Sequence, residues 1–279
     1  MDNRITIHIA TRDRWTELCL LLQSLRTQTY QNFDIIIIDD ASGGLIIQCQ
    51  PLMSLVNRLK LENHIVKIVR IDQSFGCCYA RNKCIEDDDF DNPLTLRLDD
   101  DVILEPTYIE KLLEGINKGY DMITGLIPIL SNPRIIRQIK RLGPVMNLHE
   151  FDKDGNIIKQ NDECGYCYNE SKLIPTHQFR TNCLYKSKIN KEIKYPDNLT
   201  TVAFREEGFF SLSAILKGYK LAVHTGAIAY HLQTPSGGNR RPDYSQCVQI
   251  DNETFLKWCK KRFKETGDFL KKYNKEVLK

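Results

Sequence analysis

The segment from Phe33 to Asp40 constrains the fold of this 279-residue chain more than any other feature. It reads Phe-Asp-Ile-Ile-Ile-Ile-Asp-Asp, so four consecutive isoleucines stand between acidic residues. A strand with one face in solvent alternates apolar and polar residues, whereas a continuous β-branched run is typical of a strand buried on both faces of a parallel sheet. The segment therefore predicts a sheet that helices cover on both sides.

Apolar residues on either side of this segment alternate between strand and helix periods from residue 5 to about residue 129. We expect strands at 5–10, 33–38, 64–71, 94–98 and 122–129, and helices at 15–26, 45–61, 77–85 and 106–117. This order predicts an α/β fold with a mainly parallel sheet flanked by helices. Further on, we expect an inserted loop or hairpin at 131–175, strands at 179–185, 220–223 and 227–230, a helix at 206–216 and an amphipathic helical segment at 255–278.

The charge of the chain is small and unevenly placed. The formal net charge is +3, which does not suggest a dedicated nucleic-acid binder. Residues 251–279 carry nine basic and five acidic side chains, so the remainder is close to neutral. No signal peptide is visible, and no stretch approaches the roughly 18 apolar residues of a membrane helix. We therefore expect a cytoplasmic protein whose ten cysteines are free thiols.

Polar side chains gather where three of the predicted strands end. The first strand is followed by Thr11 to Arg14, the second ends at Asp39 and Asp40, and the fourth ends at 99–101, which is Asp-Asp-Asp. Ligands of open parallel sheets bind at the carboxyl ends of the strands. Carboxylates that meet there repel one another unless a cation neutralises them, and Mg²⁺ or Mn²⁺ favours oxygen ligands shared with phosphates. A divalent metal with a diphosphate is the ligand that this pattern indicates.

Other phosphate-binding and catalytic motifs are missing from the sequence. It contains no Gly-x-x-x-x-Gly-Lys loop, no Gly-x-Gly-x-x-Gly after the first strand and no Gly-x-Ser-x-Gly elbow. Phosphates would therefore be held by the metal, the backbone and basic side chains.

The order of motifs resembles the family 2 glycosyltransferases, which have the GT-A fold. The resemblance covers about residues 4–233 and rests on the set in order and spacing, not on any single motif. It is carried by Ala10-Thr11-Arg12-Asp13-Arg14, Ser24-Leu25, Gln28-Thr29-Tyr30, Ile38-Asp39-Asp40-Ala41-Ser42, Gly76, Ala80-Arg81-Asn82, Leu98-Asp99-Asp100-Asp101, Pro106, Glu206-Glu207, Gly218 and His231. The chain departs from the family at Ala10, where proline is usual, and at Glu207, where aspartate is commoner.

The resemblance implies a role for each matched residue. Asp39 would hydrogen-bond the uracil ring of the donor, and Thr11 and Arg81 would border the nucleotide. Asp99 and Asp100 would lie near the ribose and the diphosphate. The implied metal ligands are Asp101 and His231, and the implied general base is Glu207.

These roles imply an inverting, metal-assisted transfer of a sugar from a nucleotide diphosphate sugar, with a UDP-sugar favoured, to an acceptor hydroxyl. The cofactor would be Mn²⁺ or Mg²⁺, and the acceptor a glycan, a lipid-linked molecule or a protein. Two other functions stay open at this point: a non-catalytic binding protein of glycosyltransferase-like fold, and a sugar nucleotidyltransferase. The second would need a glycine-rich first loop, which 11–14 lacks.

The resemblance also suggests a division of the chain. Residues 1–250 would form the GT-A domain, with 1–129 as the nucleotide-sugar half and 130–250 as the half that holds the acceptor and the base. Residues 251–279 would form a basic amphipathic tail, which docks on the parent domain, contacts a membrane surface peripherally or contacts another subunit. Two smaller expectations are that Asn182 and the segment Tyr195-Pro196-Asp197 line the acceptor side and that Cys164 and Cys167 pack as free thiols or, less in keeping with their spacing, bind zinc.

Overall fold

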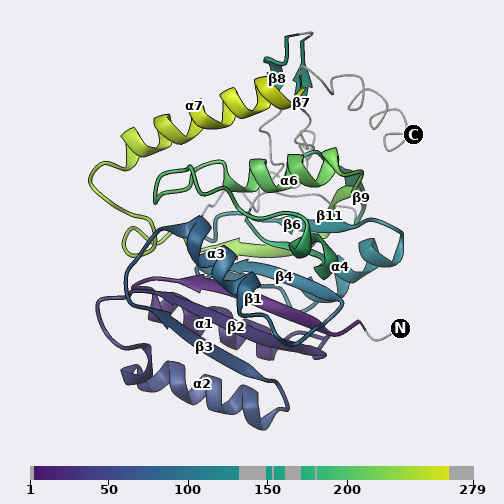
Figure 1. Ribbon diagram of the computed structural model, residues 1–279. Helices are drawn as coiled ribbons and strands as arrows, with labels where there is room; N and C mark the ends of the chain where they lie inside the picture. The colour runs from purple at the N-terminus through teal and green to yellow at the C-terminus, as the bar shows by residue number, and fades with distance from the viewer. Residues whose placement is uncertain (1–2, 132–148, 153, 161–170, 180, 264–279) are drawn as a thin grey trace.

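A single nine-stranded mixed sheet forms the centre of the molecule, and helices cover both of its faces (Figure 1). The computed structural model describes residues 3–131, 149–152, 154–160, 171–179 and 181–263. The strand order is β3-β2-β1-β4-β10-β6-β11-β5, and β9 also pairs with β11. The strands are β1 (Ile5–Thr11), β2 (Phe33–Asp40), β3 (Val66–Ile71), β4 (Leu94–Asp99), β5 (Val102–Leu104), β6 (Met122–Leu126), β9 (Leu173–Pro175), β10 (Cys183–Lys186) and β11 (Leu221–His231).

The isoleucines of β2 are buried on both faces, as the sequence predicts. Strands β3, β2, β1 and β4 run parallel, and Ile35 to Ile38 are fully buried. Ile35 and Ile37 belong to the core beneath helices α1 (Trp15–Arg26), α2 (Gln50–Leu61) and α4 (Tyr108–Asn117). Ile36 and Ile38 pack on the opposite face against α3 (Cys77–Glu86). A second core on that face joins β10 and β11 to α6 (Glu206–Leu216).

The second half of the sheet is less parallel than the first. Strand β10 pairs antiparallel with both β4 and β6, while β6 and β11 are parallel neighbours. The two strands expected at 220–223 and 227–230 form one strand, β11, with an irregular register between Val223 and Ile228. The helix expected at 45–61 is divided into a short 3₁₀ helix, Ile46–Gln48, and α2, because Pro51 can stand only in the first turn of a helix.

Strand β5 was not predicted, because three residues are too few to show a period. It follows the Asp-Asp-Asp segment directly and pairs antiparallel with the end of β11, so that Val102 lies opposite His231. This pairing brings the end of β11 next to the end of β4.

The inserted region contains a hairpin, as expected. Its strands are β7 (His149–Phe151) and β8 (Ile157–Gln160), which pair antiparallel. Cys164 and Cys167 lie outside the described residues, so their state stays a prediction.

The C-terminal helix begins earlier than the sequence suggested. Helix α7 runs Tyr244–Phe263, so the expected boundary at residue 250 falls inside it, and the proposed division of the chain stays a prediction. Phe255 and Cys259 are fully buried, and Phe255 packs edge-on against Phe209 of α6. Contact of this region with a membrane surface also stays a prediction. Among the described residues, no helix has the length and apolar character needed to cross a membrane.

Candidate active site at the carboxyl edge of the sheet

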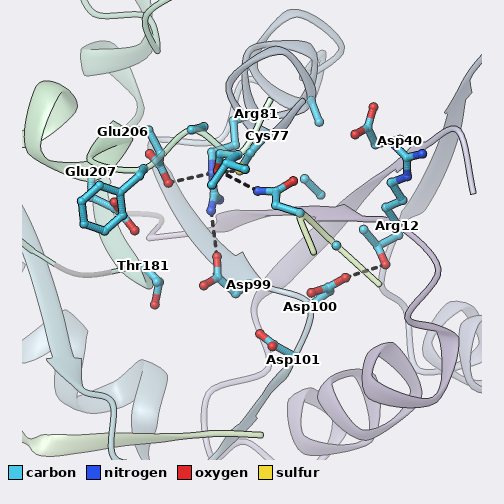
Figure 2. A pocket seen from close by; sticks show the side chains of 18 of the residues that line it. Arg12, Asp40, Cys77, Arg81, Asp99, Asp100, Asp101, Thr181, Glu206 and Glu207 are labelled. Atoms are coloured by element: carbon cyan, nitrogen blue, oxygen red, sulfur yellow. Dashed lines mark hydrogen bonds and ion pairs between the residues drawn. The ribbon is translucent and has the colours of Figure 1, made fainter. Parts of the chain in front are cut away.

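A cavity of about 480 Å³ opens at the carboxyl ends of β1 and β4, and Cys77 and Glu206, the first residues of α3 and α6, also line it (Figure 2). Backbone N–H groups at helix N-termini favour anionic ligands. Seven of the eight residues to which the sequence assigned a role line this cavity: Thr11, Arg81, Asp99, Asp100, Asp101, Glu207 and His231. Residues more than 200 positions apart are thus brought together by the sheet.

The three consecutive aspartates have different partners, although they are adjacent in sequence. Asp100 accepts a hydrogen bond from the Thr11 hydroxyl at 2.8 Å, and burial raises its pKa to about 7 against the attraction of Arg14. The Arg14 guanidinium lies 3.1 Å from Asp100 and 3.0 Å from Asp101. Asp99 pairs instead with Arg81, at 2.8 Å. Basic side chains of the chain itself therefore neutralise part of the acidic strand end.

His231 meets Asp101 because β5 pairs with β11. Its Nε2 lies 3.3 Å from Asp101 Oδ1, and one quarter of the His231 side chain is exposed to the cavity. Burial opposes a charged imidazole, but the hydrogen bond and the charge of Asp101 outweigh it, so the pKa of His231 is raised. The described residues contain no group of three or more side chains arranged to hold a metal ion. One carboxylate and one imidazole nevertheless suit a divalent ion that takes its other ligands from a diphosphate and water.

The two glutamates that begin α6 have different environments. Glu206 is 3 % exposed and forms a bidentate ion pair with the buried Arg97 of β4, at 2.5 and 3.1 Å. It also lies 3.1 Å from Arg81, which links it to Asp99. Glu207 is 21 % exposed and lines the cavity, and the Arg97 guanidinium lies 3.8 Å from its carboxylate. Of the two, Glu207 has the freedom to meet a substrate, while Glu206 is held in a buried ionic network.

Asp39 lies apart from the residues that line the cavity. It is fully buried, accepts a hydrogen bond from the backbone N–H of Ser42 at 3.1 Å and pairs with Arg70 at 2.8 Å. The next residue, Asp40, lines the cavity and accepts a hydrogen bond from Ser74 at 2.7 Å. The uracil contact expected for Asp39 stays a prediction.

Of the residues expected on the acceptor side, Asn182 and Tyr195 do not line the cavity. Both side chains are buried behind the cavity wall. The Asn182 amide oxygen accepts a hydrogen bond from the backbone N–H of Asp99 at 2.8 Å. The Tyr195 ring lies under the guanidinium of Arg97, with 5.4 Å between the guanidinium carbon and the ring centroid. They support the acidic strand end and the buried network and do not reach the cavity.

Two cavity or network residues were missed by sequence reasoning. Arg97 stands in the middle of a predicted strand, where alternation alone gave no reason to expect a buried charge. Arg14 was quoted only as part of a motif and was given no role of its own. The signal for Arg97 was available: a basic residue between leucines in a strand expected to be buried on both faces needs an acidic partner.

Comparisons with known proteins agree with this picture. A family model described as "Glycosyl transferase family 2" matches residues 6–194. A Bacillus subtilis protein named "Uncharacterized glycosyltransferase YwdF" is 29 % identical over 113 residues, which are 40 % of this chain and 38 % of that protein. The chain therefore spans about two fifths of the length of the curated relative it matches.

Solved structures share the fold at low sequence identity. A structure of GalNAc-T7 with UDP, GalNAc and Mn²⁺ has a TM-score of 0.65 and 14 % identity, covering 99 % of this chain and 57 % of that one. A structure of S. aureus TarS 1–349 in complex with UDP-GlcNAc has a TM-score of 0.57 and 12 % identity, covering 89 % and 65 %. The α/β fold expected from the sequence is thus confirmed as GT-A-like.

Proposed function

Because the chain belongs to glycosyl transferase family 2, we propose that it transfers a sugar from a nucleotide diphosphate sugar to an acceptor hydroxyl. A UDP-sugar is the favoured donor, since TarS binds UDP-GlcNAc and GalNAc-T7 binds UDP in structures of the same fold. The observation that carries the proposal is that the acidic end of β4 and Glu207 of α6 line the same cavity. A donor diphosphate and an acceptor could meet there.

The donor side of the cavity is supported by residues with fixed partners. Thr11 and Asp100 are hydrogen-bonded to each other, and Arg81 is held against Asp99, so these groups are oriented before a ligand arrives. Arg14 and Arg240 line the same cavity and are cations that could contact phosphate oxygens. Because these side chains are already oriented, less of their conformational entropy is lost when a substrate binds.

Asp101 and His231 are the residues that would hold Mn²⁺ or Mg²⁺. A divalent ion there would act as a Lewis acid on the diphosphate leaving group. The Asp101 carboxylate and an unprotonated His231 would provide two protein ligands. Arg14 would then have to share Asp101 with the metal, because its guanidinium lies 3.0 Å from the same carboxylate.

Glu207 is the proposed general base. As the acceptor hydroxyl attacks the anomeric carbon, the Glu207 carboxylate would accept its proton, and attack opposite the leaving group would invert the anomeric centre. Glu206 is a poor candidate for this role, because both of its oxygens are engaged by Arg97 and one also by Arg81. The burial of one glutamate thus favours the other as the catalytic residue.

A UDP-release assay with a panel of UDP-sugars and Mn²⁺ tests the proposal. We expect one donor to give UDP release that Asp101→Asn abolishes. The matched control is Asp89→Asn, since the Asp89 side chain is 71 % exposed and, among the described residues, forms one surface ion pair, with Lys67. A protein that binds a donor, as seen by a rise in its melting temperature, but releases no UDP with any acceptor offered would support the non-catalytic alternative instead.

A further inference from the structure

The loop that precedes α6 is held from behind by the C-terminal helix. Residues 200–205 lead directly into Glu206 and Glu207, and the stretch from Val202 to Arg205 lines the cavity. Two non-glycine residues of this loop have left-handed backbone conformations: Ala203 has a φ of 56° and Arg205 a φ of 74°. Such conformations persist only where surrounding contacts maintain them.

Asp251 of α7 provides those contacts. It is fully buried, and its two carboxylate oxygens accept three hydrogen bonds from the loop. The donors are the backbone N–H of Thr200 at 2.6 Å, the hydroxyl of Thr200 at 2.8 Å and the backbone N–H of Phe204 at 2.8 Å. A carboxylate that accepts several N–H and O–H donors makes charge-assisted bonds, which are stronger than bonds between neutral groups. One side chain therefore holds both ends of the strained turn.

Further contacts join this loop and the start of α6 to residues 239–255, which include the first half of α7. Asn252, the next residue of α7, accepts a hydrogen bond from Arg205 Nε at 3.1 Å. The amide of Asn239 donates to the carbonyl of Val202 at 3.0 Å. Phe255, one turn further along α7, packs close to Gly208 in the first turn of α6. The loop and the start of α6 are therefore seated on α7, which lies outside the region matched by the family model.

We propose that Asp251 is a positioning residue for the catalytic step: by fixing the loop 200–205 from α7 it sets where Glu207 stands in the cavity. This inference rests on the proposed role of Glu207 as the base. The C-terminal helix would then do more than pack against α6, because the loop that Asp251 holds forms the part of the cavity wall next to Glu207. The proposed donor-binding groups on β1, β4 and α3 have no hydrogen bond to Asp251, and the loop reaches α3 through a long bond, 3.4 Å, from the Cys77 N–H to the Thr201 carbonyl. Donor binding should therefore change much less than transfer when Asp251 is lost.

The test compares Asp251→Ala with two controls in steady-state kinetics. Ile250→Ala alters the adjacent but 45 % exposed residue of α7, and Val56→Ala removes two methyl groups from a buried position of α2, far from the cavity. Since a displacement of about 1 Å can lower a rate by about 100-fold, we expect kcat for transfer to fall by about 10- to 100-fold in Asp251→Ala. The KM for the donor should stay within about twofold of the wild-type value, and both controls should keep the wild-type kcat.

A purely structural role would have a different signature. If Val56→Ala and Asp251→Ala lower the melting temperature equally and change kcat equally, the positioning role is wrong. If Asp251→Ala does not fold, Thr200→Val removes the hydroxyl that donates to Asp251 and accepts from the Val202 N–H at 3.3 Å, but it keeps the two backbone N–H bonds to Asp251. It should lower kcat by a smaller factor with an unchanged donor KM. An unchanged kcat in Thr200→Val would then count against the proposal.

Hydrogen exchange separates this inference from the proposed function. In the wild-type protein the amides of Thr200 and Phe204 should exchange slowly, and Asp251→Ala or Thr200→Val should speed the exchange of at least one of them by about tenfold or more. This readout does not depend on any donor or acceptor. If the variants exchange these amides at the wild-type rate, Asp251 does not restrain the loop and the inference is wrong. If the variants exchange them faster but the wild-type protein shows no transferase activity, the restraint stands and only the proposed function is refuted.

Discussion

The ion pair between Arg97 and Glu206 makes a quantitative prediction about stability. Both side chains are almost completely buried, at 2 % and 3 % exposure, and two N–H donors of the guanidinium engage the carboxylate. Replacing Arg97 by methionine fills the site with an unbranched apolar side chain, and Arg81 is then the one cation of the described residues that is paired with Glu206. Breaking a buried pair by removing one partner costs about 3–5 kcal/mol. We expect Arg97→Met to lose about that much free energy of unfolding.

The control is the same substitution at a surface ion pair. Arg58 lies 2.7 Å from Glu62 on α2, but its side chain is 58 % exposed, so Arg58→Met should lose at most about 1 kcal/mol. Urea denaturation followed by circular dichroism measures both values. In the double variant Arg97→Met with Glu206→Met no uncompensated buried carboxylate remains, so much of the loss should be recovered.

Two results would refute this reasoning. One is an Arg97→Met protein that is no less stable than Arg58→Met, which would mean that Glu206 is solvated or neutral without its partner. The other is a double variant that is less stable than Arg97→Met alone, which would mean that the carboxylate stabilises the fold by contacts other than those to Arg97.

Three further predictions concern other parts of the chain. Glu62 accepts hydrogen bonds from Arg26 and Arg58, which lower its pKa to about 2; the stability it provides is therefore present above its ordinary pKa near 4.5 and is lost as the pH falls toward 2. The difference in melting temperature between wild type and Glu62→Gln should shrink over that window, and a difference that stays constant down to pH 2 would contradict the assignment. Gly76 and Gly119 have nearly equal positive φ values, 94° and 90°, but a Cβ at Gly76 would lie 2.5 Å from Thr201 Cα while one at Gly119 would meet nothing within 4 Å. In thermal denaturation Gly76→Ala should therefore destabilise the protein clearly more than the roughly 1 kcal/mol expected from strain alone in Gly119→Ala, and equal losses would show that the loop at Thr201 can yield. Cys77 lines the cavity, but burial raises the pKa of its thiol to about 11. Mass spectrometry should therefore find Cys77 alkylated at pH 8 about 100-fold more slowly than an unperturbed thiol. Rapid labelling of Cys77 would contradict this prediction.

Much of the sheet could be predicted because its signals are local. The isoleucine run of β2 and the helical period of α1 fix both elements within a residue or two of where the structure has them. The order of motifs then indicated the fold, and seven of the eight proposed site residues lie around one cavity. Carboxyl ends of parallel strands meet at one edge of a sheet, so residues that follow those strands meet as well.

The remaining features depend on pairings that no local pattern shows. Strand β5 is three residues long, and its partner, β11, lies more than 120 residues further along the chain. The burial of Asp39 depends on Arg70, and the buried network depends on Arg97 and Glu206, which are 109 residues apart. A charge in a strand signals that a partner is required, but the sequence does not say which residue supplies it.

The position of α7 was missed for a similar reason. Its apolar residues from Phe255 onward suggested a helix, but its first turns, from Tyr244, were not predicted to be helical, and Asp251 was expected only as part of a basic tail. Asp251 is polar because it faces the backbone of the loop 200–205 and not because it faces solvent. Polarity alone cannot separate these two situations.

The rate of sugar transfer by Glu207→Gln, measured together with its affinity for the donor, tests the central claim most directly. Glutamine keeps the size of the side chain and removes its ability to accept a proton, so kcat should fall by about 10²- to 10⁴-fold while the donor Kd stays within about twofold. The control is Glu253→Gln, an exposed position of α7, which should keep the wild-type rate. A Glu207→Gln protein that transfers sugar at nearly the wild-type rate would contradict the account.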